Sequence, residues 1–190
     1  MNTILKENLR EDFYIRLFFD TKNGFYDAGT KRAFLDFSRT LPIKDENRST
    51  LKQDAENFLI NELKKLTEKE LNNQENFDNF HRLTSENLMQ IWDELSFGQA
   101  QKWINMTLKY WLLFGETKIK GIELNARYFH IPIDSFVQKG MFKEKNPKAW
   151  SKISDYQTYL NYQIKHREKK SKNYPIVDEF EFFNQYKTKN

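Results

Sequence analysis

Two lysines and an asparagine lie along one side of an apolar segment, FGQAQKWINMTLKYWLLFG, residues 97–115. At 100° per residue, Lys102, Asn105 and Lys109 fall within an arc of roughly 60° on the helix that this segment predicts. Two ammonium groups with an amide between them could bind a phosphate group, so we expect the strip to face an anion-sized cleft. The alternative is that the lysine stems reach solvent from a core helix while Asn105 pairs with neighbouring backbone groups.

A histidine and an aspartate lie close together in the segment HIPID, residues 130–134. If Pro132 begins a helix, Asp134 stands near its third position, where a carboxylate meets the positive end of the helix dipole. Asp134 could also hold His130, orient its ring and raise its pKa. Lys102, His130 and Asp134 in one cleft would suffice for general acid–base chemistry on a phosphodiester. Helix capping alone also accounts for Asp134, and the spacing leaves open whether the three residues meet.

The third candidate is a basic run, KHREKKSK, residues 165–172. Its cations are spread around the end of a tyrosine-rich predicted helix, and tyrosine rings offer flat faces to nucleic-acid bases. Cations are also favourable at a helix C-terminus because of the helix dipole, so a purely structural interpretation is equally open. The run adds four residues to the predicted anion-binding surface: Lys165, Arg167, Lys169 and Lys170.

The sequence lacks the residues that other classes of functional site require. The chain has no cysteine and only three histidines, His81, His130 and His166, with no paired spacing typical of a metal site. It has no glycine-rich phosphate loop, no dinucleotide-binding fingerprint and no nucleophile elbow. We therefore expect neither a metal nor a cofactor.

Charge is distributed unevenly along the 190 residues. Residues 1–97 carry 14 Lys and Arg against 18 Asp and Glu, a net charge of −4, whereas residues 98–172 carry 15 against 6, a net charge of +9. A long positive stretch is typical of proteins with phosphate-bearing partners, although lysines scattered over any solvated surface give the same count. The N-terminal residues are too charged for a signal peptide, and no apolar run approaches the ~18 residues of a membrane span. These features predict a cytoplasmic protein with no membrane partner.

Helix signals recur along the chain. Ser96 and Gln99 form a capping box before residues 97–114, and Gly115 follows as a C-terminal stop. Because this helix is apolar on almost every side, it belongs at the centre of the fold. Five more Ser and Thr residues predict other helix starts: Thr3, Thr50, Thr67, Ser85 and Ser154.

Three other segments complete the predicted architecture. The asparagine-rich stretch LNNQENFDNFHR, residues 71–82, predicts a loop or a short irregular helix. Residues 119–131 could form a short hairpin, the one feature that would break an all-α fold. Pro175 separates the tyrosine-rich helix from a C-terminal helix over residues 175–187.

Together these patterns predict one compact all-α domain over residues 1–190, with about eight helices around the helix at 97–114. An acidic half, residues 1–97, precedes a basic half, residues 98–172, and the C-terminal helix ends the domain.

The leading functional hypothesis is binding of nucleic acid, or another phosphate-rich ligand, through the basic half of the chain. One alternative is an enzyme that acts on nucleic acids or nucleotides through Lys102, His130 and Asp134. The other alternative is an interaction module whose basic face meets an acidic protein. The sequence leaves the oligomeric state open.

Overall fold

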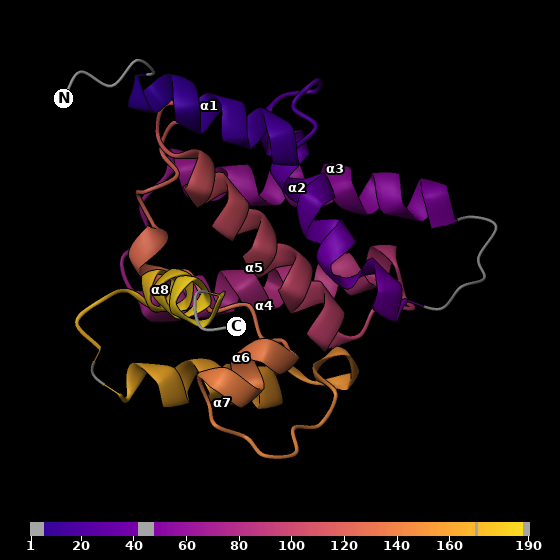
Figure 1. Ribbon diagram of the computed structural model, residues 1–190. Coiled ribbons are helices and arrows are strands. Elements are labelled where there is room, and N and C mark those ends of the chain that lie inside the picture. Colours follow the sequence, from indigo (N-terminus) through magenta and orange to yellow (C-terminus); the bar gives the residue numbers. More distant parts are fainter. Residues whose placement is uncertain (1–5, 42–47, 170, 188–190) are drawn as a thin grey trace.

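The arrangement of the chain comes from a computed structural model, which describes residues 6–41, 48–169 and 171–187 (Figure 1). These residues form eight α-helices and no strand, which confirms the all-α prediction. Thr3, a predicted helix cap, and Lys170, a predicted binding residue, lie outside the described residues. None of the described helices has both the length and the apolar character needed to cross a membrane.

The connections between successive helices are longest between α5 and α6 and between α6 and α7. In the view of Figure 1, α1 lies at the top, α5 runs diagonally through the middle, and α6 and α7 form the bottom. Their bounds are α1 (Glu7–Phe18), α2 (Phe25–Phe37), α3 (Arg48–Glu68), α4 (Gln74–Ile91), α5 (Phe97–Phe114), α6 (Ser135–Gly140), α7 (Tyr156–Arg167) and α8 (Pro175–Lys187).

Helix α5 is the centre of the core, as its sequence predicts. Trp103 and Trp111 are fully buried, and their indole N–H groups donate to the α2 carbonyls of Thr30 at 3.1 Å and Tyr26 at 3.0 Å. Gly29 allows this close approach, because a Cβ there would lie 2.6 Å from the Trp111 ring. Helix α5 is thus fixed to α2 by packing and by hydrogen bonds that satisfy both buried indoles.

Both ends of α5 are where the sequence predicts them. The Ser96 hydroxyl accepts the backbone N–H of Gln99 at 3.1 Å, and the Gln99 side chain accepts the backbone N–H of Ser96 at 2.9 Å. This reciprocal pair is the predicted capping box. The Ser96 hydroxyl also donates to the carbonyl of Ser151 at 2.6 Å, which attaches the distant 150–152 turn to the start of α5. At the other end, Gly115 follows the last helical residue with a φ of 73°, which favours glycine.

The prediction of a loop or a short irregular helix over residues 71–82 is wrong from Gln74 onwards, where a regular helix begins. Helix α4 begins at Gln74, and Asn73 caps it by accepting a backbone N–H at 2.9 Å. Ser85 lies inside this helix, where its hydroxyl donates to the His81 carbonyl at 2.8 Å, and it is therefore not a helix start. All four asparagines of this stretch are exposed: Asn72 and Asn73 precede α4, and Asn76 and Asn79 lie on its exposed side, where an amphipathic helix carries its polar residues.

Three other predicted helix starts are shifted or absent. Helix α3 continues through Thr67, whose hydroxyl donates to the Lys64 carbonyl at 2.8 Å, and Thr50 also lies within α3. Helix α7 is capped by Asp155, one residue after the predicted Ser154, because the Asp155 carboxylate accepts the N–H of Thr158. Hydroxyl residues bond readily to the preceding turn of a helix, so a Ser or Thr with a suitable partner three residues on is not always a cap.

The hairpin that the sequence allowed at residues 119–131 does not form. This segment consists of turns and a short 3-10 helix, Ala126–Tyr128. The Glu116 carboxylate accepts the backbone N–H groups of Gly121 at 2.8 Å and Glu123 at 2.9 Å. A side chain therefore satisfies backbone groups that strand pairing would otherwise satisfy.

Candidate functional site

Lys102, the first residue of the predicted strip, forms an ion pair inside the protein. Its ammonium lies 2.6 Å from the Asp134 carboxylate, and the Lys102 side chain is 6% exposed. The other Asp134 oxygen accepts the N–H of Val137 at 2.8 Å, so Asp134 is the N-cap of α6. Helix α6 therefore begins at Ser135, and the prediction of a start at Pro132 is wrong. The one carboxylate both caps a helix and neutralises a buried cation.

Lys109, at the other end of the strip, is also buried and paired. Its ammonium contacts the carboxylate of Glu179 on α8 and lies 4.8 Å and 5.1 Å from the ring centroids of Phe180 and Phe183. The space expected to hold an anion beside Lys102 and Lys109 is thus taken by the protein's own carboxylates. In this structure neither ammonium faces an open cleft.

Asn105, the middle residue of the strip, belongs to a buried polar network. Its amide Nδ2 donates to the Tyr159 hydroxyl at 2.8 Å and to Gln101 Oε1 at 3.1 Å. Asn105 is almost completely buried, so these bonds offset the loss of its hydration. Its side chain holds α5 against α7, which carries Tyr159.

His130 is held by a carboxylate other than the one predicted. Its Nε2 lies 2.7 Å from Asp78 Oδ1, and its Nδ1 lies 2.8 Å from the Tyr159 hydroxyl. Arg167 from α7 binds both oxygens of Asp78, each at 2.9 Å. The partner of His130 therefore comes from α4, 52 residues upstream, and the expectation that Asp134 holds His130 is wrong.

Electrostatics fix the charge of each member of this network. Burial opposes ionisation of Asp78, but hydrogen bonds from His130 and Arg167 outweigh it and hold the Asp78 pKa well below its usual range. Burial lowers the pKa of His130 to about 4, although its bond to Asp78 acts the other way. Burial also raises the pKa of Tyr159 well above its usual range. At neutral pH the network holds an ionised Asp78, a neutral imidazole that donates from Nε2, and a phenol that donates to Nδ1.

The order carboxylate, imidazole, hydroxyl is that of the relay in a nucleophilic triad. The Tyr159 side chain is 0% exposed and His130 is 1% exposed, so no substrate can reach the terminal hydroxyl in this conformation. The members that reach solvent, Asp78 and Arg167, are occupied with each other, at 16% and 26% side-chain exposure. The network acts as a cross-link between α4, α5, the segment before α6, and α7.

The three residues proposed as a catalytic group are divided between two separate sets of contacts. Lys102 binds Asp134, whereas His130 binds Asp78 and Tyr159. Among the described residues no hydrogen bond or ion pair joins Lys102 to His130. Within the same part of the chain, no three His, Asp or Glu side chains lie close enough together to hold a metal ion.

Two glutamines hold the extended segment that connects His130 to α6. Gln163 exchanges two hydrogen bonds with the backbone of Ile131, at 3.0 Å and 2.8 Å, and Gln101 does the same with Ile133, at 3.1 Å and 2.8 Å. Each amide supplies one donor and one acceptor, as a neighbouring strand would. These bonds let an extended, fully buried segment lie between helices without a sheet.

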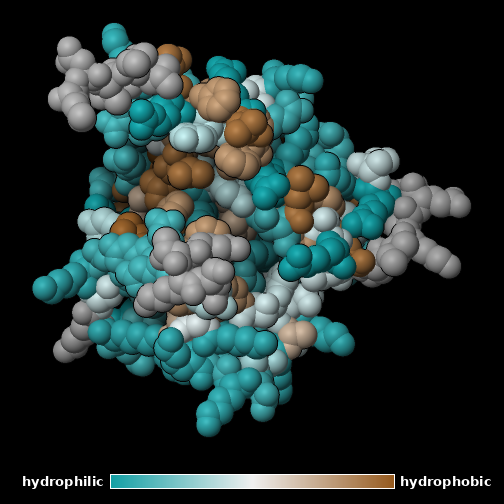
Figure 2. Space-filling model, viewed as in Figure 1, coloured by the Kyte–Doolittle hydropathy of each residue, from teal (hydrophilic) through white to brown (hydrophobic). Residues whose placement is uncertain are grey.

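Lysines on α6, on residues 141–155 and around the end of α7 form a second candidate site, which we name the basic end. Figure 2 shows the bottom of the molecule as predominantly hydrophilic, with the hydrophobic side chains of this face gathered higher up. Lys169 also donates to the Met141 carbonyl at 3.0 Å. The basic end consists of eight exposed residues: Lys139, Lys143, Lys145, Lys148, Lys152, Lys165, Lys169 and Lys172.

The basic end gathers several cations that have no ion-pair partner among the described residues. Within residues 6–41, 48–169 and 171–187, none of the eight lysines forms an ion pair. Arg167, which the sequence assigned to the same surface, is neutralised by Asp78. Elsewhere on the described surface seven cations have an acidic partner: Lys31–Asp27, Arg32–Asp36, Lys52–Glu56, Lys65–Glu62, Arg82–Glu86, Lys118–Asp12 and Arg127–Glu70. Others, such as Lys22 and Lys69, form no ion pair with the described residues, so the basic end is distinguished by how many of its lysines are exposed and unpaired.

Sequence reasoning missed Asp78 and the lysines between Lys139 and Lys152. Asp78 lies in the stretch predicted as a loop, and placing it on a helix would have put it one turn before His81. The lysines were included in the net charge of residues 98–172, but they form no compact motif in the sequence.

Comparison with models of protein families, with curated proteins and with solved structures gives no match for this chain.

Proposed function

We propose that the protein binds nucleic acid through the basic end. The observation that carries this proposal is the presence of eight exposed lysines at one end of the molecule with no acidic partner among the described residues. Unpaired surface cations keep their full attraction for phosphates, because binding does not first have to break an internal ion pair.

Three of these lysines are close enough to affect one another. Partial burial and the nearby charges of Lys165 and Lys143 lower the pKa of Lys169. Lys165 and Lys169 both lie over the ring of Phe142, at 5.9 Å and 4.9 Å from its centroid. A phosphate between these ammonium groups would relieve their mutual repulsion, which supports a polyanionic ligand.

The binding surface is narrower than the whole of residues 98–172. Lys102, Lys109 and Arg167 are paired with carboxylates of the protein, and Asn105 is bonded within the core. Of the residues named from the sequence, only Lys165 and Lys169 therefore remain available for the proposed surface among the described residues. The same pairings weaken the enzymatic alternative, because they separate Lys102 from His130.

A salt titration tests the proposal. A fluorescently labelled duplex is titrated with protein by anisotropy between about 50 mM and 200 mM salt, the range over which phosphate contacts lose most affinity. The variant Lys148→Gln/Lys152→Gln removes two charges from the basic end. Lys22→Gln/Lys69→Gln is the matched control, because it removes two exposed lysines from elsewhere on the surface.

We expect the first variant to lower the slope of log affinity against log salt by about 0.9 for each lysine that contacts a phosphate, and the control to leave it unchanged. Equal losses in both variants would contradict a specific basic end, and failure of the wild type to bind either this duplex or a single strand of the same sequence would contradict the function itself. Competition with short DNA or RNA against polyglutamate separates nucleic acid from an acidic protein partner. Stronger competition by polyglutamate would favour the protein partner.

A further inference from the structure

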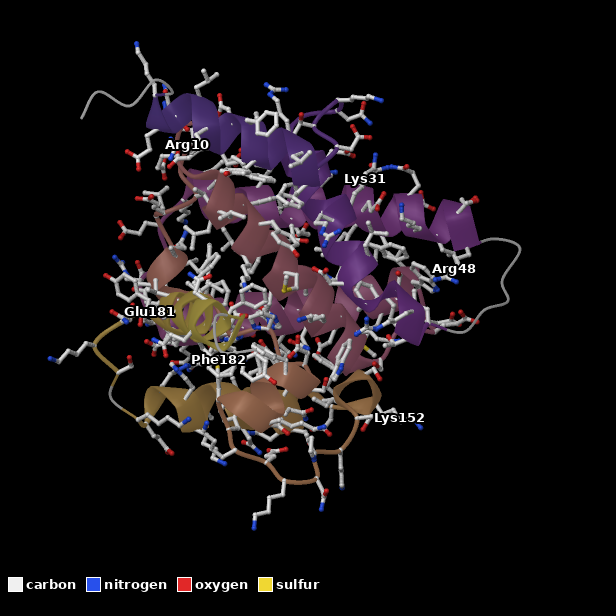
Figure 3. All side chains as sticks on the ribbon, viewed as in Figure 1. Arg10, Lys31, Arg48, Lys152, Glu181 and Phe182 are labelled. Carbon is white, nitrogen blue, oxygen red and sulfur yellow. The ribbon has the colours of Figure 1, made fainter. Side chains whose placement is uncertain are left out.

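A hollow of about 440 Å³ lies between α6 and α8, beside the basic end. Its walls include the rings of Phe136, Phe182 and Tyr186 and the side chains of Lys139 and Lys143. Figure 3 shows Phe182 projecting from α8 on the side towards α6. The volume lies within the range of ~300–1,000 Å³ that is usual for small-ligand sites.

The three rings form one aromatic wall. The Phe136 centroid lies 4.8 Å from that of Phe182 and 4.6 Å from that of Tyr186, and the rings of Phe136 and Tyr186 are nearly perpendicular at 89°. Gly140 makes room for this wall, because a Cβ there would lie 2.0 Å from the Phe182 ring. The last residue of α6 thus allows α8 to bring its aromatic side chains to the basic end.

The two lysines beside the wall are both exposed, and Lys143 occupies an unusual backbone position. Its φ of 57° makes it the sole non-glycine residue in the left-handed region among the described residues. A side chain there costs free energy that a glycine would not, so a lysine held at this position is a candidate for a functional role. Phe142 and Glu144, on either side of Lys143, are anchored to α6 by backbone bonds to Val137 and Gln138.

A second hollow, of about 400 Å³, continues from the first. The two share Gly140, Lys143 and Phe182, and the second adds Lys169, which extends the positive charge along the groove. It also contains two acidic residues. Asp178 is held by His166 at 3.1 Å and by the Ser171 hydroxyl at 2.8 Å, while Glu181 is exposed. The groove is therefore most suitable for an anion at its Lys139–Lys143 side, away from those carboxylates.

We infer that this groove binds single-stranded nucleic acid, with one base against the aromatic wall and its flanking phosphates at Lys139 and Lys143. This inference rests on the proposed function and specifies its ligand. Base–aromatic stacking accepts any base, because each base presents a π-face. Inside a duplex both faces of a base are covered by its neighbours, so only an unpaired or extruded base can enter the hollow.

The test compares a labelled 12-nucleotide single strand with a duplex of the same sequence. Tyr186→Leu removes a ring of the wall without changing the charge, and Tyr14→Leu, on α1 and also exposed, is the matched control. We expect the wild type to prefer the single strand, and Tyr186→Leu to weaken single-strand binding about tenfold while duplex binding is unchanged. Tyr14→Leu should change neither.

Thermal melting shows whether the variants are folded, and a charge variant gives a second measurement. Lys139→Gln/Lys143→Gly should reduce the preference for the single strand, whereas Lys148→Gln/Lys152→Gln should weaken both ligands equally. Equal wild-type affinity for the two ligands, or unchanged single-strand binding by Tyr186→Leu, would overturn the stacking site and leave nucleic-acid binding by the basic end intact. Failure of the wild type to bind either ligand would instead remove the proposed function.

Discussion

Lys109 on α5 and Glu179 on α8 form an ion pair in which both side chains are less than one-tenth exposed. Transfer of two charges from water to the protein interior is costly, and their mutual attraction compensates for that cost only while both are present. Helix α8 is therefore attached to the core by an ion pair in which each buried charge is tolerated only while its partner is present.

We expect Glu179→Gln to lower the free energy of unfolding by about 3–5 kcal/mol, because it leaves the Lys109 charge buried without a partner. The double variant Lys109→Met/Glu179→Leu should lose much less, since it removes both charges and keeps apolar volume. Urea denaturation of the three proteins measures the difference. A loss below about 1 kcal/mol in Glu179→Gln would mean that α8 leaves the core easily and exposes Lys109 to solvent.

The buried His130 should make the fold sensitive to acid. Its pKa is about 4 in the folded state and 6.5 in the unfolded chain, so between these values the unfolded state binds a proton that the folded state does not. Stability should therefore fall as the pH drops from about 6.5 to about 4, by on the order of 3 kcal/mol, and this residue should contribute no pH dependence above 7. His81, whose pKa burial also lowers, acts in the same direction.

Unfolding free energies at pH 7 and pH 4.5 measure this effect. The control is His130→Asn, which should be less stable at pH 7 but should lose less stability between the two pH values. Equal pH dependence in the wild type and the variant would show that His130 is not the acid-sensitive group.

Lys143→Gly should stabilise the protein by about 0.5–1 kcal/mol or leave its stability unchanged. The φ of 57° is strained for lysine and unstrained for glycine, although the greater freedom of glycine in the unfolded chain offsets part of the gain. Thermal melting measures the change, with Lys145→Gly as a comparison at a neighbouring exposed position of negative φ. A clear loss of stability in Lys143→Gly alone would show that the lysine side chain itself stabilises the turn.

Trp103→Ala should lower the free energy of unfolding by about 3–5 kcal/mol. The ring is fully buried between α2 and α4, and the substitution also leaves the Thr30 carbonyl without its donor. Tyr14→Ala, at an exposed ring on α1, is the comparison and should change stability by less than about 1 kcal/mol. Similar losses in both variants would contradict the central position of α5.

The sequence predicts α5 and the fold class because local signals decide them. The capping pair Ser96–Gln99, the terminal Gly115 and an apolar circumference all depend on neighbouring residues. The first part of helix α4 was missed, although its second half was predicted after Ser85. The asparagines of α4 are exposed, and exposed residues contribute little to the choice between helix and loop.

The candidate sites depend on contacts between distant parts of the chain, which spacing alone does not encode. The charges of Lys102 and Lys109 were visible in the sequence, but their partners are distant in the chain: Asp134 caps α6 and Glu179 lies on α8. In the basic end, by contrast, the fold brings charges together on the surface instead of pairing them in the interior. Its lysines are separated by many residues, and only the packing of α6 against α7 and α8 brings them to one surface.

The two glutamines that hold residues 131–133 have a consequence for how this sequence can vary. Each amide donates to and accepts from the same backbone unit, so glutamate loses the donor and leucine loses both groups. Asparagine is shorter by one methylene and would not span the same gap. Among relatives that keep this fold, Gln101 and Gln163 should therefore be nearly invariant while remaining inaccessible to any ligand. Invariant polar residues in a helical protein are ordinarily interpreted as catalytic or ligand-binding. Here the need to hydrogen-bond the extended backbone between the helices is enough to explain why they would be conserved.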